Sequence, residues 1–206
     1  MFNLSETDLR ADILGCGDGP ASFNAEMTGL GHRVVSVDPL YAFSKAEIEG
    51  RVRETYDPIL SQARENADRY VWAQFPTVEA LGQARLGAMR TFLADFDTGL
   101  VEGRYLPQAL PSLRFADGQF ALALCSHLLF LYSAQLSLEF HLASLAELLR
   151  VADEVRVFPL VDLECQPSAH LGPVRSHFTA QGFTAEVSTV PYEFQRGGNQ
   201  MLRLYR

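Results

Sequence analysis

The segment of this chain that is best suited to hold a ligand is Gly15-Cys16-Gly17-Asp18-Gly19. It follows a short apolar run and precedes a segment with helical character, so it stands at a strand-to-helix turn. Glycines at such a turn let backbone N–H groups approach a ligand closely, next to the partly positive start of a helix. An ordinary tight turn is the structural alternative for the glycines alone.

The spacing of these glycines bears on which ligand they hold. A dinucleotide site usually reads GxGxxG, whereas this turn reads GxGxG and has Pro20 in the third-glycine position. Asp38 ends the next apolar segment about 20 residues later, where a carboxylate can accept hydrogen bonds from both hydroxyls of a ribose. The pattern therefore argues against a nicotinamide dinucleotide and predicts that Asp38 contacts a ribose.

A second pair of polar residues, Ser126 and His127, follows the apolar segment 120–124. Open α/β sheets bind ligands at the carboxyl ends of their strands, where this pair is expected to lie. An unperturbed imidazole has a pKa of about 6.5, which would let His127 serve as a general base at neutral pH. The alternative is a structural histidine that caps the next helix or bonds to the backbone.

Asp162 and Glu164 form a pair of carboxylates after a later strand-like segment. Alternation puts both on one side of an extended chain, as a magnesium site would require. No further acid or asparagine cluster accompanies them, so we interpret the pair as part of a solvated loop and predict no metal site.

Strand-like and helical segments alternate around these residues. The run 12–14 leads into the glycine turn, 21–30 reads as a helix, and 32–38 is a β-branched strand that stops at Pro39. This alternation predicts a mainly parallel sheet that is covered on both faces and closed by an antiparallel hairpin. Further strands are predicted at 120–124, 154–160, 184–190 and 201–205, and further helices at 136–151 and 168–181.

The region from 43 to 97 interrupts the alternation. Its apolar residues recur at three- and four-residue steps in two stretches that are separated by Pro76. A doubly wound fold seldom needs a crossover of about 55 residues. The region is therefore predicted to be a helical insertion after the second strand.

Four segments together resemble the class I S-adenosylmethionine-dependent methyltransferases: ILGCGDG, VVSVDPLY, LPSLRFADGQFALALCSH and the C-terminal pair of strands. The resemblance spans nearly the whole chain outside the insertion. It implies an α/β, doubly wound, mostly parallel seven-stranded sheet in the order 3-2-1-4-5-7-6 with an antiparallel C-terminal hairpin strand. It also implies S-adenosylmethionine as the cofactor and methyl transfer, with a small molecule as the expected acceptor.

The resemblance gives roles to individual residues. His127 would face the transferred methyl group, where it is the candidate catalytic base. Asp18, Tyr105 and Ser126 are further candidates for contact with the cofactor. The positions that match the family most directly are Gly15, Cys16 and Gly17 at the methionine moiety, Asp38 at the ribose, and Pro39 and Leu40 beside the adenine.

Two positions depart from the family pattern. Ile13 stands where an acid usually precedes the first glycine by two residues, and Arg104 and Tyr105 occupy the loop in which an acid often contacts adenine. These departures motivate a second hypothesis, a protein of the same fold that binds S-adenosylmethionine or S-adenosylhomocysteine without turnover. A nicotinamide oxidoreductase is the third and weakest hypothesis.

The acceptor pocket is predicted to form where the insertion folds over the carboxyl edge of the sheet. A long connection that leaves this edge is often a functional lid. Trp72 and Tyr56 are the candidate lining residues in the insertion. Arg196, in the polar link between the last two strands, is a further candidate for substrate contact.

Composition limits the partners and the location of the protein. The chain has 206 residues, a formal net charge of −8 and a pI of about 5.1, so it would repel the phosphate backbone of a nucleic acid. We expect one domain over 1–206, no membrane span, no disulfide or zinc site among the three scattered cysteines, and a cytoplasmic location. The oligomeric state is left open.

Overall fold

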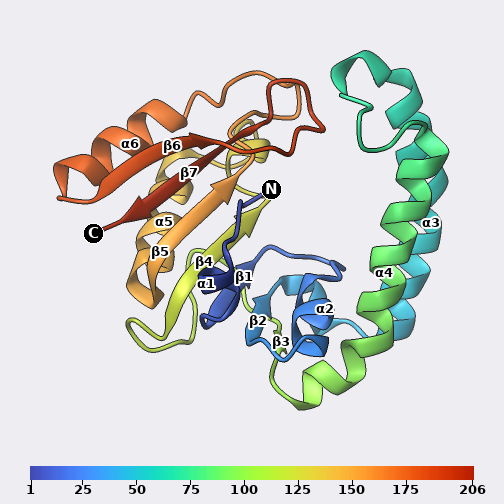
Figure 1. Ribbon diagram of the computed structural model, residues 1–206, viewed down its shortest axis with the longest axis horizontal. Helices are drawn as coiled ribbons and strands as arrows, with labels where there is room; N and C mark the ends of the chain where they lie inside the picture. The colour runs from blue at the N-terminus through green and yellow to red at the C-terminus, as the bar shows by residue number, and fades with distance from the viewer.

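Seven strands form one mixed sheet in the computed structural model, which describes residues 1–206 (Figure 1). They lie in the order β3-β2-β1-β4-β5-β7-β6, and β7 is antiparallel to both of its neighbours. The predicted fold class and strand order are confirmed. The strands are β1 (Ile13–Cys16), β2 (Val34–Val37), β3 (Tyr105–Leu106), β4 (Phe120–Ser126), β5 (Ala152–Phe158), β6 (Thr184–Thr189) and β7 (Gln200–Tyr205).

The two faces of the sheet are covered by different helices. Side chains alternate along a strand, so Leu14 joins the cluster on one face while its neighbour Ile13 joins the cluster on the other. The larger cluster packs beneath α5 (Leu138–Val151) and α6 (Leu171–Ala180), and the smaller one beneath the N-terminal segment with α1 (Glu6–Leu9) and α2 (Phe23–Gly29). No helix combines the length and the apolar character that crossing a membrane requires.

Two long helices between β2 and β3 form a hairpin that stands to one side of the sheet (Figure 1). They are α3 (Lys45–Glu65), which begins with a capping box formed by Ser44 and Glu47, and α4 (Val78–Val101). The predicted helical insertion after the second strand is therefore confirmed. The C-terminal half of α4 packs on the sheet through an aromatic cluster with Tyr41 of η1 (Pro39–Ala42) and Tyr105 of β3.

Two local predictions need correction. Tyr105 was predicted to lie in a loop, but Tyr105 and Leu106 pair with Ser36 and Val37 of β2 and form the edge strand β3. A strand of two residues shows no periodicity, so only its pairing partner reveals it. The helix predicted to begin at Ser168 begins at Leu171, because the Ser168 N–H donates to the Leu160 carbonyl at 3.0 Å and so lies outside the helix.

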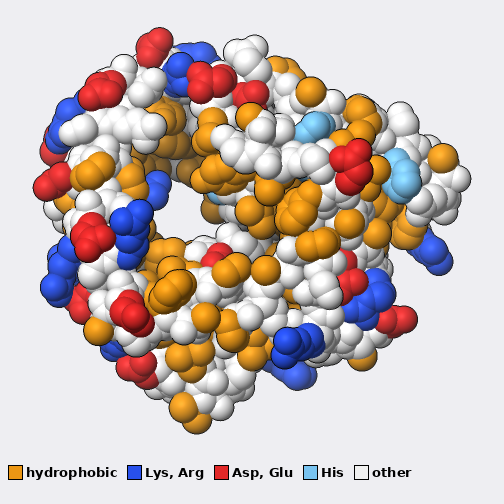
Figure 2. Space-filling model, turned by 180° about the vertical axis from the view of Figure 1, so that it is seen from behind, with side chains coloured by type: hydrophobic (Ala, Val, Ile, Leu, Met, Phe, Trp, Pro, Cys, Tyr) orange, Lys and Arg blue, Asp and Glu red, His pale blue; other side chains and the backbone are white.

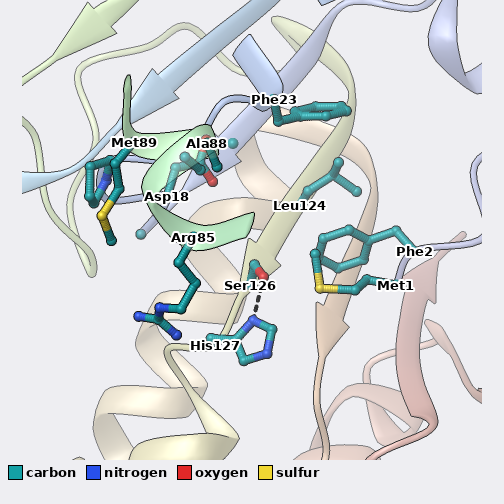
Figure 3. Close-up of a pocket in the computed structure, with 14 residues that line it drawn as sticks. Met1, Phe2, Asp18, Phe23, Arg85, Ala88, Met89, Leu124, Ser126 and His127 are labelled. Carbon is teal, nitrogen blue, oxygen red and sulfur yellow. Dashed lines mark hydrogen bonds between the residues drawn. The ribbon is translucent and has the colours of Figure 1, made fainter. Parts of the chain in front are cut away.

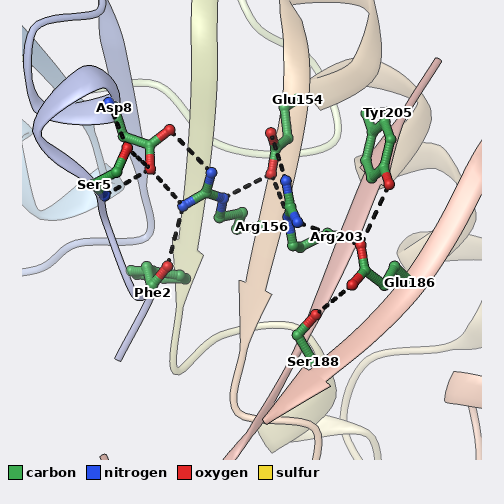
Figure 4. A network of polar contacts seen from close by, with 9 residues as sticks. All are labelled: Phe2, Ser5, Asp8, Glu154, Arg156, Glu186, Ser188, Arg203 and Tyr205. Carbon is green, nitrogen blue, oxygen red and sulfur yellow. Dashed lines mark hydrogen bonds and ion pairs between the residues drawn. The ribbon is translucent and has the colours of Figure 1, made fainter. Parts of the chain in front are cut away.

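A network of charged side chains links the N-terminal segment to the last three strands of the sheet (Figure 4). Arg156 of β5 is only 5% exposed, and its guanidinium bonds to Asp8 at 3.1 Å and to Glu154 at 2.7 Å. Glu154 also accepts from Arg203 of β7 at 2.7 Å, and Arg203 reaches Glu186 of β6 at 3.3 Å. Because a buried guanidinium is costly unless it is paired, this network fixes the N-terminal segment against the strands.

A second polar network joins α4 to the glycine turn. Arg104 donates to Asp95 of α4 at 2.6 and 2.8 Å and to the side-chain oxygen of Asn24 at 2.8 Å. The Asn24 amide donates to the Ser36 hydroxyl at 3.1 Å, and this hydroxyl donates to the Asp18 carboxylate at 2.6 Å. Asn24 is only 1% exposed. The chain of hydrogen bonds therefore sets the position of α4 relative to the glycine turn.

Replacing Asn24 by alanine should lower the free energy of unfolding by about 2–4 kcal/mol, because Arg104 and Ser36 lose a buried partner and a cavity remains. Unfolding in urea, followed by circular dichroism, measures the change. Asn66→Ala is the matched control, since the Asn66 side chain donates only to the Gln62 carbonyl at the end of α3, and its cost should stay within about 0.5 kcal/mol. Equal costs for the two variants would contradict the role given to Asn24.

Candidate functional site

The glycine turn begins in the last two residues of β1 and is hydrogen-bonded to the end of β2. Gly17 and Gly19 have φ values of +71° and +57°, which L side chains rarely adopt. The Gly17 N–H donates to the Val37 carbonyl at 2.9 Å. A Cβ atom at Gly15 would collide with the carboxylate of Asp18. These three positions therefore need glycine for reasons of backbone conformation or space.

Asp38 holds the turn from the side of β2. Its carboxylate accepts the Gly19 N–H at 2.9 Å and the Leu40 N–H at 2.8 Å, and the Tyr41 hydroxyl donates to the Gly19 carbonyl at 2.9 Å. A carboxylate has about four acceptor sites, so two remain after these bonds. Asp38 is half-buried, and its carboxylate can therefore still accept hydrogen bonds from a ligand.

Asp18 carries an unusual carboxyl group. Burial raises the pKa of Asp18 to about 6, and the charge of Asp38 acts in the same direction, while the hydrogen bond from Ser36 opposes both. A cation bound beside the turn would favour the ionised form. The charge at the turn is therefore sensitive to what is bound there.

His127 follows β4 in a strained but supported conformation. Its φ is +52°, its N–H donates to the Phe158 carbonyl at 2.7 Å, and its ring packs edge-on against the Phe158 ring at 5.6 Å. Nδ1 shares a hydrogen bond of 2.8 Å with the Ser126 hydroxyl (Figure 3). Nε2 has no partner within the protein. These contacts fix the ring and leave one nitrogen available.

The environment of His127 keeps its ring neutral. The side chain presents surface to a hollow, but protein atoms crowd around it, and this desolvation is the main cause that lowers the pKa of His127 to about 4. The positive charge of Arg85 acts in the same direction. At neutral pH the imidazole is therefore uncharged.

Two hollows meet at Gly17 and His127. The first, of about 430 Å³, lies between the glycine turn and α4 (Figure 3). The second, of about 390 Å³, lies at the end of β2 and includes Asp38 and Gln108. Both volumes fall within the range of small-molecule sites. Two ligands, or two parts of one ligand, could therefore occupy the two hollows and meet beside Gly17 and His127.

The insertion was predicted from the sequence to line a pocket, but the residues of α4 that form a wall of the first hollow were not among those predicted. Arg85, Ala88 and Met89 follow the helical three- and four-residue spacing, so they share one face of α4. The signal in the sequence was an arginine within an otherwise apolar face. Figure 2 shows an opening between the hairpin and the rest of the molecule, with hydrophobic side chains along much of its rim.

The tip of the hairpin, residues 66–77 between α3 and α4, contacts the link between β6 and β7, residues 190–199 (Figure 1). The Val71 N–H donates to the Phe194 carbonyl at 2.7 Å, and the rings of Tyr70 and Phe194 stack with centroids 4.7 Å apart. Arg196 donates to two backbone carbonyls of the tip, at 3.1 and 3.3 Å. The hairpin is therefore supported at both ends and lies over the carboxyl edge of the sheet.

The structure brings most of the predicted site residues together. Leu40 lies in η1, where its backbone bonds to Asp38. The other residues divide between the hollows: Gly15, Asp18 and Ser126 line the first, Cys16, Asp38 and Pro39 the second, and Gly17 and His127 both.

Besides Leu40, four predicted site residues lie outside both hollows. Tyr105 is 1% exposed, and its hydroxyl donates to Asp95 at 2.9 Å. Tyr56 lies between α3 and α4, and Trp72 and Arg196 belong to the contact at the tip, where the indole N–H donates to the Ala67 carbonyl at 2.9 Å. These side chains serve contacts between segments that are distant in the sequence, which residue type and spacing do not reveal.

Asp162 and Glu164 make the contacts of a loop. The Asp162 carboxylate accepts the backbone N–H groups of Glu164 and Gln166, both at 2.9 Å, and Glu164 forms an ion pair of 2.6 Å with Arg69 of the tip. Both acids thus have partners that organise the loop and its contact with the hairpin.

The ring of His127 should titrate near pH 4 in NMR spectra of the folded protein. Arg85→Met removes a nearby positive charge and should raise this pKa, whereas Arg90→Met, on the same helix but outside the hollow, should leave it unchanged. An unfolded histidine protonates at about 6.5, so the stability that His127 contributes is present above that pH and is lost as the pH falls through 4. A His127 that titrates near 6.5 in the folded protein would refute the assigned environment.

Comparisons with known proteins come from sequence and from structure. No family model matches the chain. It is 32% identical over 207 aligned positions to the uncharacterised protein MJ0045 of Methanocaldococcus jannaschii, an alignment that covers 100% of this chain and 90% of that protein.

Three solved structures share the fold at low identity. A putative O-methyltransferase of Nostoc punctiforme has a TM-score of 0.51 at 11% identity, with 97% of this chain and 53% of that one covered. The S-adenosylmethionine-dependent methyltransferase SibL in its apo form has a TM-score of 0.50 at 15% identity, with 100% and 53% covered. The PH0226 protein of Pyrococcus horikoshii has a TM-score of 0.50 at 10% identity, with 95% and 82% covered. This chain spans about half the length of the first two, and the likeness shows the fold alone.

Proposed function

We propose a function for this chain from two facts: it belongs to the same family as the MJ0045 protein, and it has the fold of the class I S-adenosylmethionine-dependent methyltransferases. We propose that it binds S-adenosylmethionine at the glycine turn and transfers the methyl group to a small molecule held beside α4. The observation that supports this most is that the two hollows meet at Gly17 and His127. A methyl donor and its acceptor need such a junction.

The second hollow has the side chains that an adenosine moiety requires. Asp38 keeps free acceptor sites that suit the two ribose hydroxyls. Pro39 offers an apolar wall for the adenine, and Gln108 supplies the polar group there. The side-chain oxygen of Gln108 accepts the Arg114 N–H at 2.6 Å, so its NH₂ group is the part left to donate. Gln108 thus stands in for the acid that the sequence lacks after the third strand.

The glycine turn suits the charged end of the cofactor. When bound, S-adenosylmethionine supplies a methyl group activated by a positively charged sulfur. Asp18, within the turn, has a raised pKa of about 6, and a nearby cation would favour its ionised form. The backbone of Gly17 is open on the side of both hollows. The turn therefore offers negative charge and close backbone approach in one place.

His127 is the residue that we propose to accept the proton of the acceptor. In the tautomer whose Nδ1–H donates to the Ser126 hydroxyl, Nε2 of the neutral ring is free to accept a hydrogen bond from a hydroxyl or amine. A base whose pKa is about 4 takes up a proton readily only as the new bond to carbon forms and the acceptor becomes acidic. Alignment of the methyl donor and the acceptor would lower the activation barrier more than this proton transfer does, by up to about 7–11 kcal/mol.

A protein that binds the cofactor without turnover is the second candidate. Ile13 replaces the acid that usually precedes the glycines, and it is 1% exposed within the apolar cluster that includes Phe2 and Met27. No polar group replaces it at that point of β1. The weak basicity of His127 favours the same alternative.

Calorimetric titration of the full chain tests the proposal. S-adenosylmethionine and S-adenosylhomocysteine should each bind at one site per chain, and NAD should not bind, because Pro20 occupies the third-glycine position. Conversion of S-adenosylmethionine to S-adenosylhomocysteine in the presence of small-molecule acceptors then separates an enzyme from a binding protein. Binding of NAD but not of S-adenosylhomocysteine would overturn both candidate functions.

Asp38→Ala should weaken S-adenosylmethionine binding by about 1–3 kcal/mol, or roughly 5- to 150-fold, because the ribose hydroxyls lose a charged acceptor. Calorimetry measures the affinity, and circular dichroism checks that the variant folds. Asp153→Ala is the control, since Asp153 is an exposed acid near the start of β5, at the opposite edge of the sheet. Unchanged affinity in the folded Asp38→Ala protein would place the ribose elsewhere.

A further inference from the structure

Arg85 is a cation without an acidic partner in the wall of the first hollow. Other arginines of the hairpin, such as Arg53 and Arg64, form ion pairs with Glu49 and Glu79 at 2.6 and 2.8 Å. Arg85 forms no ion pair and no side-chain hydrogen bond. Figure 3 shows the Arg85 side chain extending from α4 in the direction of His127, and both residues line the hollow. A guanidinium in this position is available to a ligand.

The surroundings of Arg85 lack negative charge. The positive charge of Arg85 acts to lower the pKa of three side chains, His127, Tyr70 and Tyr192. None of the three is anionic at neutral pH. The one acid that lines this hollow, Asp18, forms no ion pair with Arg85, and its carboxylate accepts the Ser36 hydroxyl at 2.6 Å. Arg85 is thus the cation that the hairpin contributes to this hollow, while Met1, whose N-terminal ammonium also lowers the pKa of His127, lines it from another segment.

The apolar walls of the hollow strengthen the attraction of the Arg85 guanidinium for an anion. Apolar side chains from Ala88, Met89 and Leu124 surround the space, and electrostatic attraction is stronger where water is partly excluded. The planar guanidinium fork matches a carboxylate or a phosphate with two parallel hydrogen bonds. The chain as a whole carries a net charge of −8 and would repel an anion, so an anionic ligand needs such a local cation.

We infer that Arg85 binds a carboxylate or phosphate group of the methyl acceptor, which is therefore a small anionic molecule. This inference rests on the proposed function. The same chemistry could come from the carboxylate of the methionine moiety in the cofactor. Arg85 lies on α4 of the hairpin, whereas the glycine turn lies at the end of β1, and this separate position favours the acceptor.

The first measurement uses simple probes on the protein saturated with S-adenosylhomocysteine. Benzoate and phenyl phosphate should bind about tenfold or more tightly than the neutral benzamide, because a hydrogen bond to a charged group is the stronger one. Arg85→Met should abolish this preference, and Arg85→Lys should retain part of it. Arg90→Met is the control, since Arg90 lies on the same helix, has no ion pair and does not line the hollow.

The second measurement separates the two sources of the anion. Arg85→Met should leave the affinities for S-adenosylhomocysteine and for 5′-methylthioadenosine, which has no carboxylate, equally unchanged. A loss for S-adenosylhomocysteine alone would assign Arg85 to the cofactor and overturn the inference. Equal binding of benzoate and benzamide to the unmodified protein, or an equal effect of Arg90→Met, would also overturn it. If S-adenosylhomocysteine does not bind at all, the proposed function fails, while a preference for benzoate that Arg85→Met removes would still establish the anion site.

Discussion

The position of the hairpin over the sheet depends on one buried chain of hydrogen bonds. It runs from Asp95 through Arg104, Asn24 and Ser36 to Asp18, and each link is 3.1 Å or shorter. Asn24 is the centre of the chain, because its amide both accepts and donates and has almost no contact with solvent. A buried polar chain is favourable only when every member is satisfied, so these five residues hold one arrangement. The same chain that places α4 also orients the carboxylate of the glycine turn.

Support at the other end of the hairpin is of a different kind. At the tip, Tyr70 stacks on Phe194, and Arg196 bonds to backbone carbonyls across the contact. This contact is smaller and more exposed than the packing of α4 on Tyr41 and Tyr105. Regions with few buried contacts open most readily. A hairpin fixed firmly at its base and lightly at its tip is suited to admit a ligand to the hollow that it covers.

Charge is distributed unequally across the site. Asp18 and Asp38 lie at the glycine turn and the end of β2, Arg85 lies on the hairpin, and the neutral ring of His127 lines both hollows. A cationic methyl donor and an anionic acceptor would each meet the opposite charge in this arrangement. Because the proposed transfer neutralises the sulfur, the same groups would hold the products less tightly on the donor side.

The sequence by itself determined the parts of the protein that depend on short-range spacing. The turn with Gly15 and Gly17, the strand that ends at Asp38 and the alternation of strands and helices are local patterns, and the resemblance that they support led to the observed strand order. Tertiary structure alone decided that Tyr105 is buried in a cluster, that Trp72 belongs to the tip contact, and that Arg85 lines the same hollow as the glycine turn. Local spacing tells which side chains share a face of one helix or strand. It does not tell which segments, far apart in the sequence, that face will meet.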